Sequence, residues 1–461
     1  MSRSTVRFCL PLLGALVGLI GCGGGDAPRT TFGHVPPEPI IRGDVPGQGN
    51  LISYQSVDTM TADELTAFMK TTLGSSLGDP RFGTLPDAVD GMDYYCYMYS
   101  SIDYNGALTT LSGAVALPTN GSPKGLIIYT HGTAVGQNAC PSIGITGPDA
   151  FPEAAVAVSA YTSGGYAVVL PDYIGQGSSL AAHPYVMPAR NAPAGRDAAI
   201  AALAIAAQLN RPIGPNLYIT GYSEGGANAM GLTQLMEQAP IPGLTLVTSA
   251  PMSGPYDLSG AQREMLMGPQ QPSPEDLQFA PLLLTGDLVN SANAYFGVKP
   301  GDVFKAAFAA QIPSAFGGKK TAKQALEALT LAATLSGYRK KSDGAYHLAD
   351  IMKPAAASAL TSGDPTYIIN QILAANNTFD WSPTVPMYLV GLQQDTLVSF
   401  NNTISAMKAM RARGITNSQL NYHGINGPDL NHLTAVTGAS ILVRHYLDGG
   451  FEAVPVDSDP S

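Results

Sequence analysis

The residues with the clearest chemical potential lie in the stretch Asn216 to Gly226, which reads NLYITGYSEGG. Within it, Gly221 to Gly225 match the pattern G-x-S-x-G around Ser223. The residues before Ser223 are apolar, aromatic or β-branched, which is typical of a short buried strand, and Ala227 to Met236 read as a helix. A serine on a sharp turn between a strand and a helix is typical of a nucleophile held at the tip of a sheet. Ser223 is therefore the candidate nucleophile.

The context of this pattern matters because the pattern is short and the chain is rich in glycine. Gly74 to Gly78 also fit it, but they follow a helix-like run, Thr61 to Leu73, instead of a strand. We set that copy aside. The alternative for Ser223 is an ordinary Gly-Ser turn, which the strand and helix around it argue against.

A serine becomes a good nucleophile when a base takes its proton and an acid orients the base. In folds with this type of turn, the acid and the histidine follow the serine in the chain. Asp395 comes just after the apolar strand Val385 to Gly391 and is the preferred acid, unless it only caps a turn or helix. Asp257, also just past a strand, is the rival, and Asp429 is a weaker one.

Three histidines follow Asp395. His432 lies in a loop after the last expected strand, from which a base can reach the serine, so it is the preferred base. His423 ends a strand and is the alternative, whereas His445 falls within the last expected helix. A purely structural His432 would cap that helix.

The negative charge that forms on an attacked carbonyl needs fixed N–H donors. One donor should be the backbone N–H of Glu224, the residue after the nucleophile, and the second that of Gly132 or Thr133, in the loop after the strand Gly125 to Thr130. We assign the Glu224 side chain no proton transfer, and we expect His131 to shape this loop.

The composition limits the classes of function. The chain has 461 residues, of which 45% are hydrophobic and 13% charged, and its net charge is −10. It is long enough for one large domain with an insertion or for two domains, and it resembles neither a disordered nor a multi-span membrane protein. An acidic chain without a basic patch is not expected to bind nucleic acid. No nucleotide-binding or metal-binding motif occurs, so we expect no metal and no cofactor.

The N-terminus reads as an export signal. Arg3 and Arg7 precede an apolar core, Phe8 to Ile20, that is too short to span a bilayer. The sequence Leu-Ile-Gly-Cys ending at Cys22 resembles the bacterial lipobox. That resemblance implies a signal peptide over 1–21, a lipid attached to Cys22, a flexible tether over 22–50, and an exported lipoprotein at the outer membrane or cell surface. The alternative is an ordinary secretory signal.

Two further cysteines, Cys96 and Cys140, fall in the part expected to fold. In an exported protein they could form one disulfide, and the alternative is two buried free thiols.

Strands alternate with helices along most of the chain, which predicts a mostly parallel sheet with helices on both faces. We assign 51–258 and 381–461 to this core. The alternation stops over 259–380, where the predicted elements are helices only, so we expect a helical cap inserted after the sixth strand. The expected strands are 94–99, 110–117, 125–130, 166–170, 217–220, 244–250, 385–391 and 419–423, and the expected cap helices are 274–293, 300–311, 321–336 and 365–375.

Five ordered motifs resemble the secretory-lipase branch of the α/β-hydrolases, which includes bacterial esterases. They are THGT (130–133), PDYIGQG (171–177), HPY (183–185), GYSEGG (221–226) and SGPYDL (253–258). The resemblance covers about 94–446 apart from the insertion. It implies an α/β-hydrolase fold, with Ser223 as nucleophile, Asp395 as acid, His432 as base, a structural Asp172, and a cap over an acyl pocket.

Together these features predict a serine hydrolase that cleaves carboxylic esters through an acyl-enzyme, without a cofactor. Its partners would be a small or lipid ester and, through the N-terminal lipid only, a membrane. The alternatives are a serine peptidase on the same fold and a non-catalytic surface-binding lipoprotein. The apolar cap residues Leu282, Leu283, Leu284, Tyr295 and Phe296 suit an acyl chain, but they could equally form the cap's own core.

Overall fold

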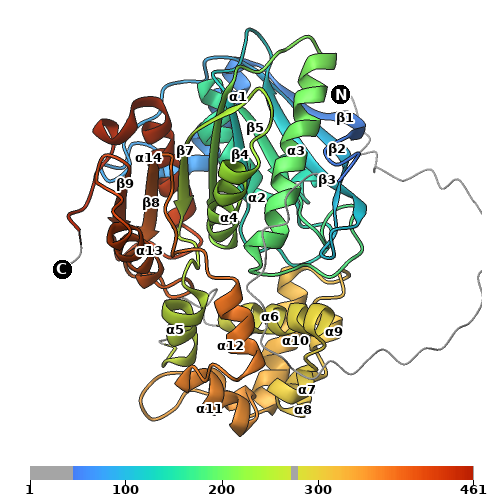
Figure 1. Cartoon of the computed structure of the whole chain (residues 1–461), viewed down its shortest axis with the longest axis vertical. Coiled ribbons are helices and arrows are strands. Elements are labelled where there is room, and N and C mark those ends of the chain that lie inside the picture. Colours follow the sequence, from blue (N-terminus) through green and yellow to red (C-terminus); the bar gives the residue numbers. More distant parts are fainter. Residues whose placement is uncertain (1–44, 271–278, 460–461) are drawn as a thin grey trace, which may run out of the picture. The chain divides into compact units, whose positions relative to one another are not determined.

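The computed structural model describes residues 45–270 and 279–459 (Figure 1). The expected signal peptide, Cys22 and most of the expected tether lie outside the described residues. Within the described ranges, no helix is both long enough and apolar enough to cross a membrane.

Nine strands form one sheet in the order β1-β2-β3-β5-β4-β6-β7-β8-β9. Along this order, β1, β2, β3 and β5 pair antiparallel, and β5, β4, β6, β7, β8 and β9 pair parallel. The sheet is therefore mostly parallel, as the sequence predicts. The five parallel pairings place the carboxyl ends of β4, β5, β6, β7, β8 and β9 at one edge. The strands are β1 (Leu51–Met60), β2 (Met92–Ile102), β3 (Leu108–Pro118), β4 (Leu126–Thr130), β5 (Ala167–Pro171), β6 (Asn216–Tyr222), β7 (Thr245–Met252), β8 (Met387–Leu392) and β9 (Leu420–Ile425).

Helices cover both faces of this sheet (Figure 1). On one face pack α1 (Ala62–Leu73), α2 (Pro152–Tyr161) and α14 (Ala435–Gly449). On the other pack α3 (Pro188–Gln208), α4 (Glu224–Gln238) and α13 (Asn401–Ala412). The strands in the middle are buried on both sides, which explains why β4, β5 and β8 are apolar throughout.

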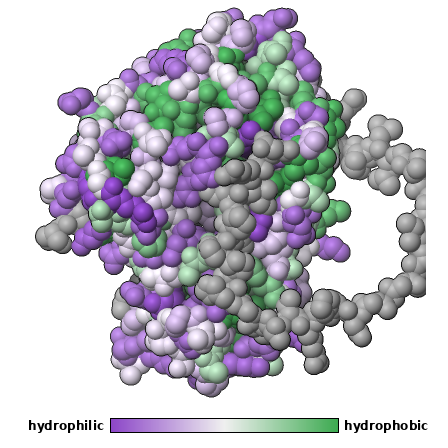
Figure 2. All heavy atoms as spheres, in the orientation of Figure 1, coloured by the Kyte–Doolittle hydropathy of each residue, from purple (hydrophilic) through white to green (hydrophobic). Residues whose placement is uncertain are grey.

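The chain between β7 and β8 forms the helical cap, which lies below the sheet in Figure 1. Its apolar side chains form a separate core, which also takes in Tyr185, Val186 and Met187 from the loop before α3. On the face drawn in Figure 2, hydrophilic side chains predominate over the cap. The cap helices are α5 (Arg263–Met267), α6 (Ala280–Phe296), α7 (Pro300–Val303), α8 (Ala306–Ala309), α9 (Ile312–Ala315), α10 (Ala322–Leu335), α11 (Pro354–Ser362) and α12 (Ile368–Ala375).

Two predicted features of the elements were wrong in detail. Strand β1 was not predicted, so the cap follows the seventh strand and not the sixth. β1 is an edge strand without a fully buried residue, and it therefore lacks the apolar pattern that marks the others. The single helix expected over 300–311 is broken after Val303. There Phe304 is extended and bridges to Met352, while the N–H of Lys305 donates to the carbonyl of Ile351.

The two folded-domain cysteines are free and buried, so the structure contains no disulfide between Cys96 and Cys140. The Sγ of Cys140 instead lies 3.6 Å from both the carbonyl oxygen of Gln137 and the hydroxyl of Ser142. This is the alternative of two buried thiols.

Helix α4 begins in direct contact with the backbone of β4, and only glycine fits there. A Cβ on Gly225 would lie 2.0 Å from the carbonyl oxygen of Thr130, and one on Gly221 would lie 2.1 Å from its Oγ1. Both clashes involve groups inside the sheet that cannot move aside cheaply.

We therefore expect Gly225→Ala to lower the free energy of unfolding by about 3 kcal/mol or more, because overpacking a rigid core is costly. Gly301→Ala is the matched control. No atom lies within 4 Å of its added Cβ, so it should change stability by less than about 0.5 kcal/mol. Denaturant unfolding of the two variants checks this, and equal effects would contradict the packing argument.

Candidate active site

Ser223 lies on the turn between β6 and α4, at the edge of the sheet where the parallel strands end. Its backbone has φ +60° and ψ −126°, a strained conformation for a residue other than glycine. The turn is held in place because the N–H of Ser223 donates to Met252 and its carbonyl accepts from Gly226. This geometry turns the hydroxyl out of the sheet, as the sequence pattern predicts.

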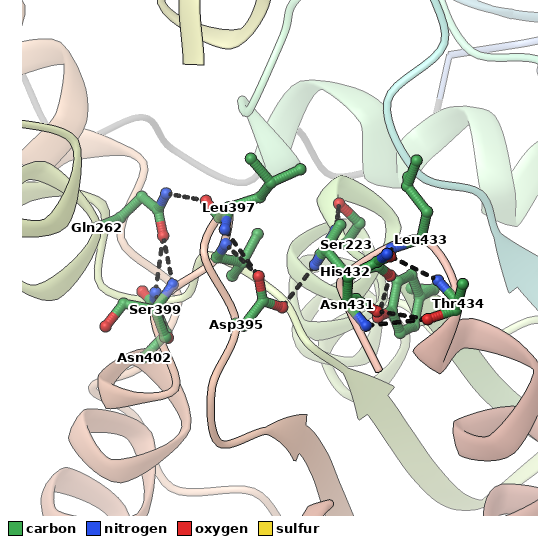
Figure 3. Close-up of polar contacts among 12 residues, drawn as sticks. Ser223, Gln262, Asp395, Leu397, Ser399, Asn402, Asn431, His432, Leu433 and Thr434 are labelled. Carbon is green, nitrogen blue, oxygen red and sulfur yellow. Dashed lines mark hydrogen bonds and ion pairs between the residues drawn. The ribbon is translucent and has the colours of Figure 1, made fainter. Parts of the chain in front are cut away.

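His432 and Asp395 meet Ser223 in one hydrogen-bonded chain (Figure 3). The Nε2 atom of His432 is 2.7 Å from Oγ of Ser223, and its Nδ1 atom is 2.6 Å from Oδ2 of Asp395. A carboxylate only accepts hydrogen bonds, so Nδ1 carries a proton and, in the neutral ring, Nε2 presents its lone pair to the serine. Both residues are buried. The three groups can therefore pass a proton from the serine to the imidazole.

The loop after β8 holds Asp395 in a fixed orientation. Its Oδ1 atom accepts the backbone N–H groups of Leu397 and Val398, which leaves Oδ2 for the histidine. Gln262, which follows β7, braces this loop by donating to Leu397 and accepting from Ser399 and Asn402 (Figure 3). Gln262 is not predictable from the sequence, because nothing near it in the chain indicates a contact with residues more than 130 positions away.

The rival residues have other partners. Asp257 accepts from Gly260, Ala261 and Ser405 and so caps the helical turn that follows it. Asp429 forms an exposed ion pair with Arg81. His423 pairs with Asp457. His445 lies in α14, next to Gly83. None of the four joins the chain of Ser223, His432 and Asp395.

The loop after β4 presents its two expected donors differently. The N–H of Gly132 donates to both carboxyl oxygens of Glu153, at 2.9 and 3.0 Å, so it is already engaged. Among the described residues, the N–H groups of Thr133 and Glu224 donate no hydrogen bond. Of these three backbone groups, the N–H groups of Thr133 and Glu224 are thus left without an acceptor, whereas that of Gly132 anchors the loop.

Glu153, at the start of α2, was not foreseen as part of the site. Its carboxyl also accepts the hydroxyl of Tyr129. A Cβ built on Gly132 would lie 3.0 Å from Oε2 of Glu153 and 3.2 Å from Cβ of Ser223, so this glycine is all that separates the two residues. Burial raises the pKa of Glu153 to about 7, although the Gly132 N–H and the Tyr129 hydroxyl oppose the shift. The sequence signal available was only a glutamate in the first turn of a helix.

A cavity of about 630 Å³ joins these residues to the cap. Ser223, His432, Glu153 and Thr133 lie on its core side. Its cap side is mostly apolar, and its polar residues are Gln262, Arg263 and Thr285. This size is within the usual range for small-molecule sites. The apolar lining from the cap comprises Leu266, Met267, Leu283, Leu284, Leu288, Val289, Val303, Leu326, Leu348, Met352, Leu360, Ile369 and Leu373.

This lining divides the apolar cap residues named from the sequence. Leu283 and Leu284 face the cavity, Leu282 is fully buried in the cap core, and Tyr295 and Phe296 pack beside that core. In the described ranges, no group of three His, Cys, Asp or Glu side chains is placed to hold a metal ion.

The raised pKa of Glu153 makes stability depend on pH. The folded state keeps this proton between pH 4.5 and about 7 while the unfolded chain loses it, so the contribution of Glu153 is most favourable below pH 4.5 and is lost as pH rises to 7. Glu153→Gln keeps an acceptor for Gly132 without the charge. We expect it to be more stable than the wild type at pH 8, by on the order of 1–3 kcal/mol, and about equal at pH 4.

Urea unfolding at both pH values measures this difference. Asp429→Asn, which removes an exposed carboxylate, is the control and should not reproduce the pattern. A constant difference between Glu153→Gln and the wild type across pH would contradict a buried proton on Glu153.

No protein-family model matches this sequence, and neither does any curated protein sequence. Solved structures do match. A ligand-bound form of the rice cell wall degrading esterase LipA from Xanthomonas oryzae is 24% identical, with a TM-score of 0.71 over 88% of this chain and 98% of LipA. Candida antarctica lipase A in its closed state is 14% identical, with a TM-score of 0.57 over 93% of this chain and 89% of the lipase. With the sheet order, the helices on both faces and the cap after β7, these similarities show that the chain has the α/β-hydrolase fold.

Proposed function

We propose that this protein is a serine hydrolase that cleaves carboxylic esters through an acyl-enzyme intermediate. The observation that carries the proposal is the hydrogen-bonded chain from Ser223 through His432 to Asp395, which opens into an apolar cavity. A serine with a purely structural role would not require a buried imidazole at its hydroxyl whose other nitrogen, Nδ1 of His432, is held by a carboxylate.

In the proposed reaction, Oγ of Ser223 attacks the ester carbonyl while Nε2 of His432 takes its proton. Asp395 stabilises the imidazolium and keeps the ring in the required tautomer. The N–H groups of Thr133 and Glu224 receive the oxyanion. The imidazolium then protonates the departing alcohol, and a water activated by His432 releases the acid from Ser223.

The cavity favours an ester with an apolar acyl group. Ester oxygens can face Ser223 and His432, while an acyl chain can lie along the cap leucines. The names of the two similar structures, an esterase and a lipase, fit this class of substrate.

Export and anchoring through a lipid on Cys22 complete the proposal. They are supported by the basic, apolar and Leu-Ile-Gly-Cys segments of the N-terminus. Mass spectrometry of the mature N-terminal peptide tests them, since an unmodified or uncleaved Cys22 would contradict them.

The nucleophile is tested by hydrolysis of p-nitrophenyl butyrate. We expect Ser223→Ala to lose at least about 10⁴-fold in kcat, because the covalent step is removed. Ser76→Ala changes the serine of the other G-x-S-x-G pattern, whose hydroxyl forms a hydrogen bond with that of Thr437, and should keep wild-type activity. A folded wild type without esterase activity would move the assignment to a peptidase or a binding protein, and labelling by a fluorophosphonate separates those two.

Acyl-chain length provides a second test. Each CH₂ buried in the cavity contributes about 0.8 kcal/mol, so KM for p-nitrophenyl esters should fall by up to about fourfold per CH₂ while the chain still fits. The fall should stop at the length that fills the cavity. A KM that is independent of length from acetyl to decanoyl would show that the cap cavity does not bind the acyl group.

A further inference from the structure

A second buried histidine, His183, lies behind the nucleophile turn and has no role in the chemistry proposed above. Its Nε2 atom is 2.8 Å from Oε1 of Glu224, the residue that follows Ser223. Its Nδ1 atom is 2.9 Å from the carbonyl oxygen of Ile174. The two side chains are 8% and 1% exposed, so water has little access to their contact.

These two partners determine the protonation state of the ring. A backbone carbonyl only accepts hydrogen bonds, so Nδ1 of His183 carries a proton, and a second proton lies between Nε2 and Oε1 of Glu224. Burial is the largest single influence and lowers the pKa of His183. The charge and hydrogen bond of Glu224, with smaller contributions from Asp287 and the Ile174 carbonyl, together raise the pKa to about 9. The pair is therefore a buried ion pair at neutral pH. The removal of one member would leave the other charge unpaired, which is strongly unfavourable.

The same segment also holds the cap. The hydroxyl of Ser291, in cap helix α6, donates to the carbonyl of His183 at 2.6 Å and accepts the N–H of Tyr185 at 3.0 Å. The hydroxyl of Tyr295, one turn further along α6, donates to the carbonyl of Ala182. The nucleophile turn and the cap thus meet at His183.

We propose that His183 is a positioning residue whose imidazolium holds the side chain of Glu224, so that the backbone N–H of Glu224 keeps its direction toward the oxyanion. This inference rests on the proposed function. Glu224 is the first residue of α4, and its Oε2 atom is buried without a partner in the described structure, so Oε1 supplies the fixed contacts. Without His183, the Glu224 carboxylate would have to turn toward water. That movement would displace the Glu224 backbone and its N–H group.

The first test compares His183→Gln with the wild type on p-nitrophenyl butyrate. A donor misplaced by about 1 Å can cost on the order of 100-fold, so we expect kcat to fall 10- to 100-fold with little change in KM, because the cap cavity is intact. His423→Gln is the matched control. It breaks another histidine–carboxylate pair, with Asp457, and should leave kcat unchanged.

The second test is the pH profile, which a merely structural role would not alter. The titratable side chains facing His183 are Glu224 from α4, Asp287 from α6, and Tyr173, Tyr185 and His131 from the loops. Because the pKa of His183 is raised, its contribution persists at low pH and is lost as pH rises through about 9. The wild type should lose kcat/KM over that range, and His183→Gln should lack this step.

Glu224→Gln keeps the backbone N–H and an acceptor oxygen while removing the charge. It should move the alkaline loss to lower pH, since His183 then lacks the anion that raises its pKa. This conservative variant also serves if His183→Gln fails to fold, which circular dichroism would show.

Labelling of Ser223 by a fluorophosphonate makes the test independent of ester turnover. A wild type that is labelled but hydrolyses no ester would end the proposed function, and a slower labelling of His183→Gln would still support the positioning role. Wild-type kcat and labelling rate in folded His183→Gln, or an alkaline step that persists in it, would overturn the inference. A wild type that reacts with neither probe would overturn both proposals.

Discussion

The turn at Ser223 is the constraint on which the rest of the site depends. Ser223 has a positive φ and lies between β6 and α4. This arrangement is possible because Gly221 and Gly225 have no side chain and let α4 contact the backbone of β4. The strain is maintained by sheet packing on both sides and by the bond from the Ser223 N–H to Met252. Once this turn is fixed, the N–H of Glu224 and the hydroxyl of Ser223 have fixed directions. The loops after β4, β8 and β9 then have to place their functional groups next to this N–H and this hydroxyl.

The loop after β4 meets that requirement with an anchor and a donor in adjacent residues. Gly132 gives its N–H to Glu153, and the next residue, Thr133, lines the cavity with an N–H that donates to no group in the described structure. A Cβ at this position would make tight contacts with Glu153 on one side and Ser223 on the other, at 3.0 and 3.2 Å. The carboxyl of Glu153 therefore fixes the loop, although it lies near the proposed oxyanion. Burial favours the neutral form of this carboxyl up to about pH 7.

The sequence predicted the parts of the site that depend on local pattern and strand order. Ser223 had a strand, a turn and a helix around it, and Asp395 and His432 followed strands whose carboxyl ends share one edge. The parts it did not predict depend on contacts between distant segments. Gln262 carries no local signal, Glu153 is marked only as an acid in the first turn of a helix, and His183 only by its place in the HPY motif. Their roles depend on partners from 21 to 140 positions away. Strand β1 was missed for a related reason: as an exposed edge it needs little apolar sequence.

Three acidic residues lie around Ser223, and the surroundings of each offset its negative charge in a different way. Asp395 is offset by two backbone N–H groups and by His432. Glu153 lies against an apolar cavity that favours its protonated form. Glu224 is the most exacting case, because its own backbone is the proposed oxyanion donor and an unpaired carboxylate there would oppose the charge that the donor must stabilise. The His183 imidazolium cancels that charge at 2.8 Å, away from water. A glutamate directly after the nucleophile is thus compatible with an oxyanion site as long as the cation behind it stays protonated.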